Sequence, residues 1–359
     1  MSGERQDKTR ETLCIIDGSS VFYRAFHAVP SSFTSTSGMP TNAVYGFTQT
    51  LRKIIKEFSP RYIAVAFDVK GPSFRHEMFT EYKAERPAMP DALSVQIPYI
   101  KRIVKAFNIA AIEMASFEAD DVIATLAIKF AKKGLRVAMV TGDKDMYQLI
   151  NGNVFILDYN SGKECGPAEV VEKFGVEPGL IRDMLGLAGD TSDNIPGVPG
   201  IGYKTAAKLL NRYGNLEKIY ENLDDITGEK LRENLRGHRD QAFLSRELAT
   251  LHPQVPVECE LDGLEYNGPD QKELEPLLRE LDFRRILSEV MAEGPAGPAQ
   301  DHEYDEIRDG AGVEAALKGA RRLSITLAFH GEGEGGEGEP LSTGLCVDND
   351  KAYFLRSGA

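Results

Sequence analysis

Nine acidic residues stand at positions suited to chemistry, either directly after an apolar run or at the start of a helical pattern. They are Asp17, Asp68, Glu118, Asp120, Asp121, Asp143, Asp145, Asp190 and Asp193. Asp143 and Asp145 belong to TGDKD at the end of a predicted strand, where alternating side chains and the following turn can aim both carboxylates at one point. Glu118 and Asp121 are three residues apart, so they share one face of the first turn of a helix.

Any one of these acids has a structural explanation, but the whole set predicts bound cations. An acid at the start of a helix complements the helix dipole, and an aspartate after a strand caps the next helix. Together, however, the carboxylates would repel one another and raise each other's pKa values unless cations neutralised them. Oxygen ligands suit Mg²⁺, for which Mn²⁺ can substitute, and two such ions about 4 Å apart stabilise the attacking and leaving oxygens of a phosphodiester. The pattern therefore predicts phosphodiester hydrolysis.

Apolar runs predict the strands that must place these acids. The runs cover residues 13–16, 62–67, 136–140 and 154–157, and they are typical of buried parallel strands. Asp17, Asp68 and Asp143 follow the first three runs closely, while helical patterns intervene at residues 42–58 and after Phe117. This alternation predicts an α/β fold with a mostly parallel central sheet and flanking helices. The acids should meet at the carboxyl edge of that sheet.

The chain is predicted to contain one large domain, a linker and a fragment. The domain covers residues 1–290, with an α/β catalytic part at about 1–177 and a glycine-punctuated helical part at about 178–290. The linker, 291–300, includes EGPAGPAQ. Residues 301–359 are too few for a complete domain, so we expect a partial α/β fragment. It should have strands at 322–329 and 351–355 that flank a mobile loop, GEGEGGEGEP, at 331–340.

Composition limits the class of protein and of partner. Hydrophobic residues make up 42% and charged residues 27%, which argues against a disordered or fibrous protein. The polar start lacks a signal-peptide core and no apolar run reaches a membrane span, so we expect a cytoplasmic protein. Four scattered cysteines form no zinc or disulfide pattern. The net charge of −13 would argue against a nucleic-acid partner, unless acids concentrated in a metal site and the tail leave a basic surface elsewhere.

Basic and aromatic residues alternate after Asp68. Arg75, Phe79, Tyr82, Lys83 and Arg86 would fall largely along one side if this stretch were helical. Cations there could neutralise phosphates while a ring stacks on a displaced base, which suits single strands and frayed ends. The alternative is a solvated charged helix with two aromatic residues anchored in the core.

A glycine-rich loop covers residues 197–205 and reads GVPGIGYKT. It is a poor dinucleotide fingerprint because no strand precedes it and Thr205 replaces the last glycine. A helix-turn-helix hairpin is a better interpretation, with glycines that let the backbone approach a phosphate at the start of a helix. The alternative is a purely structural cap and loop.

Six motifs carry a resemblance to a known family. They are IIDGSSVFYRAFHA (15–28), VAFDVKGPSFRHE (65–77), YKAERPAMP (82–90), EADDVIATLA (118–127), VTGDKDMYQL (140–149) and GLAGDTSDNIPGVPGIGYKTAAKLL (186–210). In this order, within about residues 13–290, the chain resembles the flap-endonuclease-like 5′ nucleases, and specifically the 5′-nuclease domains of bacterial DNA polymerase I. The resemblance implies a PIN-like 5′-nuclease fold with a helical arch and a helix-hairpin-helix part. It also implies that all nine acids form the metal site for two Mg²⁺ ions.

The resemblance further assigns the residues that hold DNA. Lys83 and Arg86 would stabilise charge at the scissile phosphate, Tyr82 would stack near it, and Arg24 and Arg75 would contact the DNA nearby. The hairpin would bind duplex backbone, and could hold a K⁺ ion, through Gly197, Gly200, Gly202, Lys204, Thr205 and Lys208. No histidine is predicted as a ligand.

The implied function is a structure-specific 5′ nuclease, a 5′-3′ exonuclease and flap endonuclease acting in primer removal and DNA repair. Its partners would be branched, nicked or 5′-flap DNA, including RNA-primed strands, with a polymerase domain in the same natural chain. Two alternatives remain: a DNA-junction binding module that has lost cleavage, and a ribonuclease of the small acidic-site type.

The fragment at 301–359 resembles the opening of a 3′-5′ exonuclease domain. Active domains of that kind place an Asp-x-Glu pair on their first strand, because their hydrolysis also depends on carboxylate-held cations. Residues 323–328 read LSITLA and contain no acid. We therefore expect a degenerate domain without proofreading activity.

Overall fold

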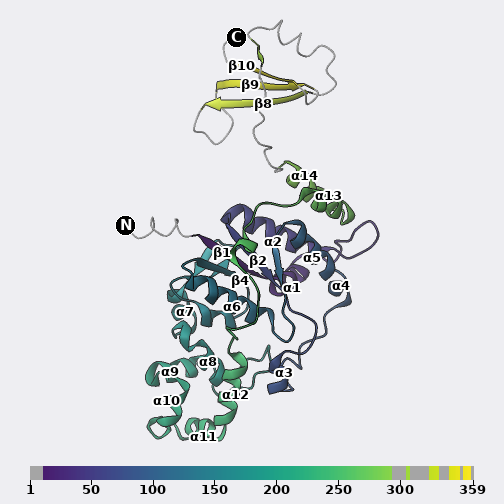
Figure 1. Cartoon of the computed structure of the whole chain (residues 1–359). Helices are drawn as coiled ribbons and strands as arrows, with labels where there is room; N and C mark the ends of the chain where they lie inside the picture. Colours follow the sequence, from purple (N-terminus) through teal and green to yellow (C-terminus); the bar gives the residue numbers. More distant parts are fainter. Residues whose placement is uncertain (1–10, 293–304, 308–322, 331–338, 348–350, 357–359) are drawn as a thin grey trace. The chain divides into compact units, whose positions relative to one another are not determined.

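The chain divides into two units, Met1–Ser288 and Glu289–Ala359. A computed structural model describes residues 11–292, 305–307, 323–330, 339–347 and 351–356 (Figure 1).

A six-stranded sheet forms the centre of the first unit, with the strand order β3-β2-β1-β4-β5-β6. The strands are β1 (Thr12–Asp17), β2 (Tyr62–Ala66), β3 (Ala110–Ile112), β4 (Arg136–Val140), β5 (Val154–Asp158) and β6 (Lys163–Cys165). The first five pair in parallel and β6 is antiparallel to β5. The chain builds outward from β1 to β3 and then crosses to β4 on the other side of β1. This switch point beside β1 is where open α/β sheets place their sites.

The structure confirms the predicted mostly parallel sheet and all four strands expected in it. It adds β3 and β6, which the sequence did not reveal because each is only three residues long and lies at an edge of the sheet. Such short edge strands carry too few residues for a periodic pattern.

Long helices flank the sheet because each has an apolar face. The predicted helix at 42–58 is α2 (Asn42–Phe58), which buries Val44, Phe47, Leu51 and Ile54 at intervals of three and four residues. Apart from the short α3 (Phe74–Met78) and α4 (Asp91–Ser94), the other helices in this part are α1 (Gly18–Ala28), α5 (Ile97–Ala106), α6 (Ala119–Lys132) and α7 (Pro167–Phe174). The helix expected after Phe117 is thus α6.

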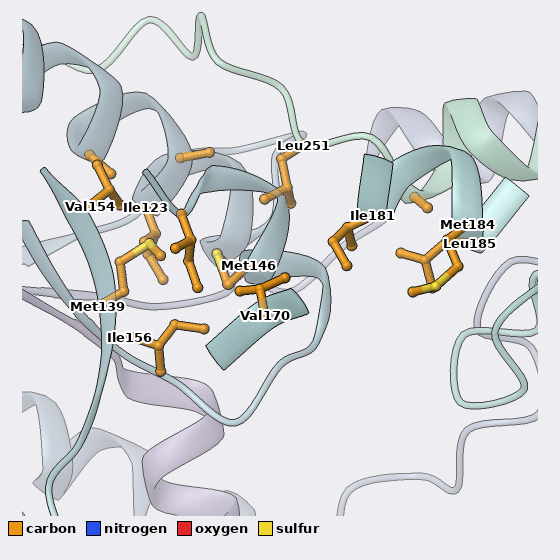
Figure 2. Close-up of a cluster of buried hydrophobic side chains, with 14 of the residues drawn as sticks. Ile123, Met139, Met146, Val154, Ile156, Val170, Ile181, Met184, Leu185 and Leu251 are labelled. Atoms are coloured by element: carbon orange, nitrogen blue, oxygen red, sulfur yellow. The ribbon is translucent and has the colours of Figure 1, made fainter. Parts of the chain in front are cut away.

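One buried hydrophobic cluster continues from the sheet into the helical part. Figure 2 shows Met139 and Ile156 of the sheet near Ile123 of α6 and Val170 of α7, with Met184 on the neighbouring helix α8 (Ile181–Ala188). Because this apolar core is shared, the acids at the end of β4 and the loop after α8 are held by the same packed body.

The helical part contains α8, α9 (Tyr203–Tyr213), α10 (Leu216–Glu221), α11 (Glu229–Gly237) and α12 (Arg239–Ala249). The later helices are α13 (Gln271–Glu280) and α14 (Arg284–Ala292). α13 packs against α5, and the Asp270 amide donates to Ala106 O at 2.8 Å. The segment predicted as one helical part, 178–290, therefore returns to the α/β part before its last helices.

The second unit contains a four-stranded sheet with the order β7-β10-β9-β8. Its strands are β7 (Asp305–Ile307), β8 (Leu323–His330), β9 (Glu339–Val347) and β10 (Lys351–Arg356). Two of them match the strands expected at 322–329 and 351–355. The loop expected at 331–340 lies outside the described residues except for 339–340, which begin β9. The expected linker, 291–300, is described only at 291–292, which end α14.

No helix among the described residues combines the length and the apolar character that crossing a membrane requires.

Candidate active site

The acids gather at the carboxyl edge of the sheet, as the sequence predicts. Asp17 ends β1, Asp68 follows β2 by two residues, Asp143 follows β4, and Asp120 lies in the first turn of α6. The structure brings these four together closely enough that each acts electrostatically on at least one of the others. Their elements also include both strands at the switch point, β1 and β4.

Asp17 is buried and caps α1. Its Oδ1 accepts from the Ser20 amide at 2.8 Å, and its Oδ2 accepts from the Thr141 hydroxyl at 2.8 Å. Burial, reinforced by the charges of Asp68 and Asp143, outweighs these hydrogen bonds and raises the pKa of Asp17 to about 7. A cation near this carboxylate would remove much of that penalty.

The pKa values of Asp120 and Asp143 are raised for the same reasons as that of Asp17. Burial raises the pKa of Asp120 well above its ordinary range, and the charges of Asp143, Asp17 and Asp68 raise it further. Burial also raises the pKa of Asp143, even though its Oδ1 accepts from the Asp145 amide at 2.8 Å. The Lys83 ammonium only partly offsets both effects.

A second group of acids is formed by Asp145, Asp190 and Asp193. One carboxylate oxygen from each lies within 4.8 Å of the other two, and all three residues are buried. Asp145 Oδ1 is buried and, within the described part of the chain, has no hydrogen-bond partner. Burial and the charge of Asp143 raise the pKa of Asp145 well above its ordinary range. A buried carboxylate that has an oxygen without a donor and lies next to two more carboxylates fits a hard divalent cation.

Three cations already neutralise part of this acidic edge. The Lys144 ammonium donates to Asp190 Oδ1 at 2.7 Å, Lys83 lies 3.7 Å from Asp193 Oδ2, and Arg86 is bonded to Asp193 Oδ1. Burial opposes ionisation of Asp190, but Lys144 outweighs it and the pKa of Asp190 is lowered. Lys144 was not among the predicted site residues, although its position between two acids of TGDKD was a signal.

Glu118 lies at the boundary between the acids and the basic segment. Its Oε2 is 2.9 Å from the Lys83 ammonium and accepts from the Tyr82 hydroxyl at 3.1 Å. Burial would raise its pKa, but Lys83 and Arg75 outweigh burial, so the pKa of Glu118 is lowered. Glu118 is thus ionised and paired with protein cations.

The segment between β2 and α5 is not a single helix. The predicted alignment of basic and aromatic residues along one side required such a helix, so this alignment is not formed. The segment contains α3 (Phe74–Met78), a run of turns, and α4 (Asp91–Ser94), with Pro87 and Pro90 in between. Proline disfavours helix at the residue before it, and Lys83 has a positive φ of 54°, which no helix accommodates. We call residues 74–90 the arch segment.

Tyr82 does not project from the arch segment as a stacking platform. Its side chain is only 3% exposed, and its hydroxyl donates to Glu118 Oε2. Its ring therefore belongs to the core beneath the site, and the structure gives it a positioning contact in place of the predicted base stacking.

Arg75 and Asp121 also differ from their predicted roles. Arg75, expected on a DNA-facing surface, is 2% exposed, and both of its terminal nitrogens donate to Asp121, at 2.7 and 2.8 Å. Asp121, expected among the metal ligands, is completely buried in that ion pair. This pairing could not be predicted from the sequence, because it joins residues of two motifs that lie 46 positions apart.

The glycine-rich hairpin lies between α8 and α9. Gly197 has a φ of +60°, and a Cβ there would lie 2.3 Å from the Gly189 amide nitrogen, so this position requires glycine. Gly202 precedes α9 with a negative φ, and a Cβ on it would meet nothing within 4 Å. Lys204 and Lys208 are exposed on α9. The first amides of a helix have no intrahelical acceptor, so this exposed end can bind an anion.

The remaining hairpin and DNA-contact candidates are Gly200, Thr205 and Arg24. Gly200 has a φ of +80°, and the Thr205 amide donates to Gly202 O at 3.0 Å. Arg24 is exposed on α1, with its guanidinium 5.7 Å from the centre of the Tyr159 ring.

Family models match most of the first unit. The N-terminal resolvase-like domain of 5′-3′ exonucleases matches residues 12–175, and their C-terminal SAM fold matches residues 176–272. The chain is 41% identical over 280 residues to a 5′-3′ exonuclease of Aquifex aeolicus, covering 78% of this chain and 95% of the relative. It is also 41% identical over 353 residues to DNA polymerase I of Bacillus subtilis, covering 96% of this chain but 39% of that protein.

Solved structures agree on the fold. The T5 D15 protein co-crystallised with metal ions matches with a TM-score of 0.57 and 25% identity, covering 76% of this chain and 99% of that one. The catalytic core of Rad2 in complex with DNA substrate matches with a TM-score of 0.56 and 17% identity, covering 79% and 93%. The latter supports the fold alone. With its sheet, its acidic edge and its close relatives in agreement, the chain belongs to the 5′-3′ exonuclease family, whose members include the 5′-nuclease part of DNA polymerase I.

Proposed function

We propose that this chain is a structure-specific 5′ nuclease that hydrolyses DNA phosphodiesters with two divalent cations, Mg²⁺ or Mn²⁺. The observation that carries the proposal is the buried group Asp145, Asp190 and Asp193, in which Asp145 Oδ1 lacks a hydrogen-bond donor within the described residues. A bound divalent cation supplies the partner that such an oxygen lacks.

The acids supply two binding groups that share an edge. Asp17, Asp68, Asp120 and Asp143 would hold one ion, and Asp145, Asp190 and Asp193 the other, with Asp143 electrostatically in contact with both groups. When bound, the two ions supply the positive charge that stabilises the attacking and leaving oxygens of an in-line displacement. Glu118 would act from the border of the first group, where Lys83 contacts it.

The chain's own cations would orient the scissile phosphate. Lys83 and Arg86 reach the acidic edge from the arch segment, and both are bonded there to carboxylates. The carboxylates hold these two side chains in place, so that a phosphate entering the site meets donors that are already oriented. Ion pairing also keeps both side chains charged. Burial lowers their pKa values, but Glu118 and then Asp193 outweigh it for Lys83, and Asp193 outweighs it for Arg86, so both pKa values are raised.

The hairpin would hold the duplex next to the cut. Exposed Lys204 and Lys208, with the first amides of α9, present donors to a phosphate backbone without reading bases. Gly200 and Thr205 shape this loop, which could also bind K⁺. Arg24 is exposed on α1 with its guanidinium beside Gly142, the residue before Asp143, so it could contact a DNA strand that enters the acidic edge.

The natural context proposed is DNA polymerase I, acting on branched, nicked or 5′-flap DNA and on RNA-primed strands. The chain spans about a third of the DNA polymerase I relatives: 32% of the Bacillus caldotenax protein and 39% of the Bacillus subtilis protein. Its second unit would be the start of a degenerate 3′-5′ exonuclease domain leading toward a polymerase domain, with the domain boundary near residue 290.

A flap-cleavage assay tests the proposal. The wild-type chain should cut a labelled 5′-flap DNA in Mg²⁺ and should lose that activity in EDTA, because the acidic edge needs cations. Asp143→Ala should abolish cutting while DNA binding stays measurable. Asp158→Ala is the matched control, because Asp158 also ends a strand of the sheet but lies outside both acidic groups; it should cut normally. Wild-type activity that survives EDTA would refute the metal mechanism.

Two other classes of protein give different results in the same assay. A DNA-junction binding module would bind the flap without cutting it in any metal. A ribonuclease would prefer single-stranded RNA to the flap, and it would not need the hairpin or the arch segment.

A further inference from the structure

We infer that Arg75 and Asp121 act together as a positioning pair that fixes the catalytic edge, and that neither contacts metal or DNA. The inference rests on the proposed function, because it assigns these two residues a role in the same site. The observation behind the inference is that other protein groups already use all the hydrogen-bonding positions of both side chains.

Asp121 has no lone pair left for a metal. Its Oδ1 accepts from Arg75 Nη2 at 2.8 Å and from the His252 amide at 2.8 Å. Its Oδ2 accepts from Arg75 Nη1 at 2.7 Å and from the Glu118 amide at 3.2 Å. An ionised carboxylate offers about four acceptor sites, and these four donors fill them. The neighbouring Asp120, by contrast, faces other carboxylates.

Arg75 has no donor left for a phosphate. Besides its two bonds to Asp121, its Nε donates to Leu248 O at 2.8 Å and its Nη2 to Thr250 O at 3.0 Å. Its Nη1 lies 3.4 Å from Glu118 Oε2. A guanidinium has five N–H donors, and five acceptors surround this one. The planar guanidinium also lies over the Phe74 side chain, with its Cζ 4.5 Å from the centre of the Phe74 ring.

The pair joins three segments that must keep a fixed geometry. Arg75 belongs to α3 at the start of the arch segment, Asp121 to the first turn of α6, and residues 248–252 to the end of α12 and the chain beyond it. Phe74, Phe117 and His252 pack around the same junction with ring centres 5.3 to 5.9 Å apart. Glu118 directly precedes α6 and Asp120 lies in its first turn, so the pair holds the carboxylates that the reaction would use.

Metal binding separates a positioning role from a ligand role. Calorimetric titration of the DNA-free full chain with Mn²⁺ compares Asp121→Asn with Asp120→Asn, which makes the same chemical change one residue away. We expect Asp120→Asn to weaken Mn²⁺ binding by about a hundredfold or more, because it removes a ligand, and Asp121→Asn to weaken it by about tenfold, because it only loosens the support of the ligands. An equal loss in both variants would make Asp121 a ligand and overturn the inference.

The cleavage rate separates positioning from mere stability. In a single-turnover flap assay at saturating Mg²⁺, Asp121→Asn should be slower than wild type by about tenfold or more. Ile103→Ala, in the fully buried face of α5, is the control for lost stability and should cut at the wild-type rate. A normal rate for Asp121→Asn would show that the pair is only structural. If circular dichroism shows that Asp121→Asn is unfolded, Arg75→Lys replaces it, because one ammonium cannot hold both carboxylate oxygens.

Salt dependence tests the other half of the inference. Arg75→Gln should leave the salt slope of DNA binding unchanged, whereas Lys204→Ala should reduce it by about one. A reduced salt slope for Arg75→Gln would show that Arg75 contacts a DNA phosphate and would contradict the inference. The proposed function can fail separately: a wild-type chain that does not cut the flap refutes it, while the Mn²⁺ titrations still decide whether Asp121 is a ligand.

Discussion

Removing the divalent cations should make the folded protein less stable as the pH rises from 5 to 8, and Asp17 should contribute to this effect together with Asp120, Asp143 and Asp145. The pKa of Asp17 is raised from the ordinary 3.8 to about 7, first by burial and then by Asp68 and Asp143. A carboxyl with a raised folded-state pKa stabilises the protein fully below its unfolded pKa. That stability is lost as the pH rises through the folded pKa.

The size of the effect follows from the two pKa values. The full difference between 3.8 and about 7 corresponds to on the order of 4 kcal/mol. Between pH 5 and pH 8, about 2 to 3 kcal/mol of this should be lost from the free energy of unfolding. Mg²⁺ binds only the ionised carboxylates, so it should restore more stability at pH 8 than at pH 5.

Urea unfolding in EDTA and in Mg²⁺, at several pH values, measures both effects. Asp17→Asn keeps an acceptor for the Ser20 amide but removes the charge, so in EDTA at pH 8 it should be more stable than wild type. It should also lose that part of the pH dependence. The reasoning is refuted if the stability in EDTA does not change with pH, or if Asp17→Asn retains the wild-type pH profile.

Three further predictions follow from the other parts of the chain. Lys83→Ala should slow single-turnover cleavage at saturating enzyme, whereas Lys204→Ala should mainly weaken DNA binding and lower its salt slope by about one; equal effects on the rate would contradict this division. Gly197→Ala should lower the free energy of unfolding by more than about 1 kcal/mol, because its φ is +60° and its Cβ would strike backbone, and Gly202→Ala, where the space is open, should cost less in the same urea titration. Residues 301–359 should add no proofreading: a mismatched primer labelled at its 5′ end should keep its length when the 5′-nuclease site is inactivated, and stepwise shortening would show the opposite.

The sequence predicted the sheet and its acidic edge because both depend on local patterns. A run such as 136–140 is apolar enough to be a buried strand, and Asp143 must then lie at its carboxyl end. The sequence did not predict which acids pair with protein cations. Arg75 looks like any surface arginine of a basic segment, and only the folded chain shows Leu248 and Asp121 around it. Such pairs depend on tertiary contacts between distant motifs, and residue type alone does not encode them.

Hydrogen bonds join the arch segment to the loop after α8 at Asp193 and Asn194. Lys83 and Asn194 both adopt a φ of +54°. This left-handed conformation costs a residue with a side chain on the order of 1 kcal/mol or more, so it persists only where surrounding contacts offset the cost. The surroundings do so here: the Lys83 amide donates to Asp193 O at 2.9 Å, and Asn194 Nδ2 donates to Glu81 O at 2.8 Å. The same loop leads through residues 195–202 into the hairpin of α9. A shift of the hairpin that moved Asp193 would therefore also move Lys83, so the geometry of the duplex-side loop and that of the basic residue nearest Glu118 cannot vary independently.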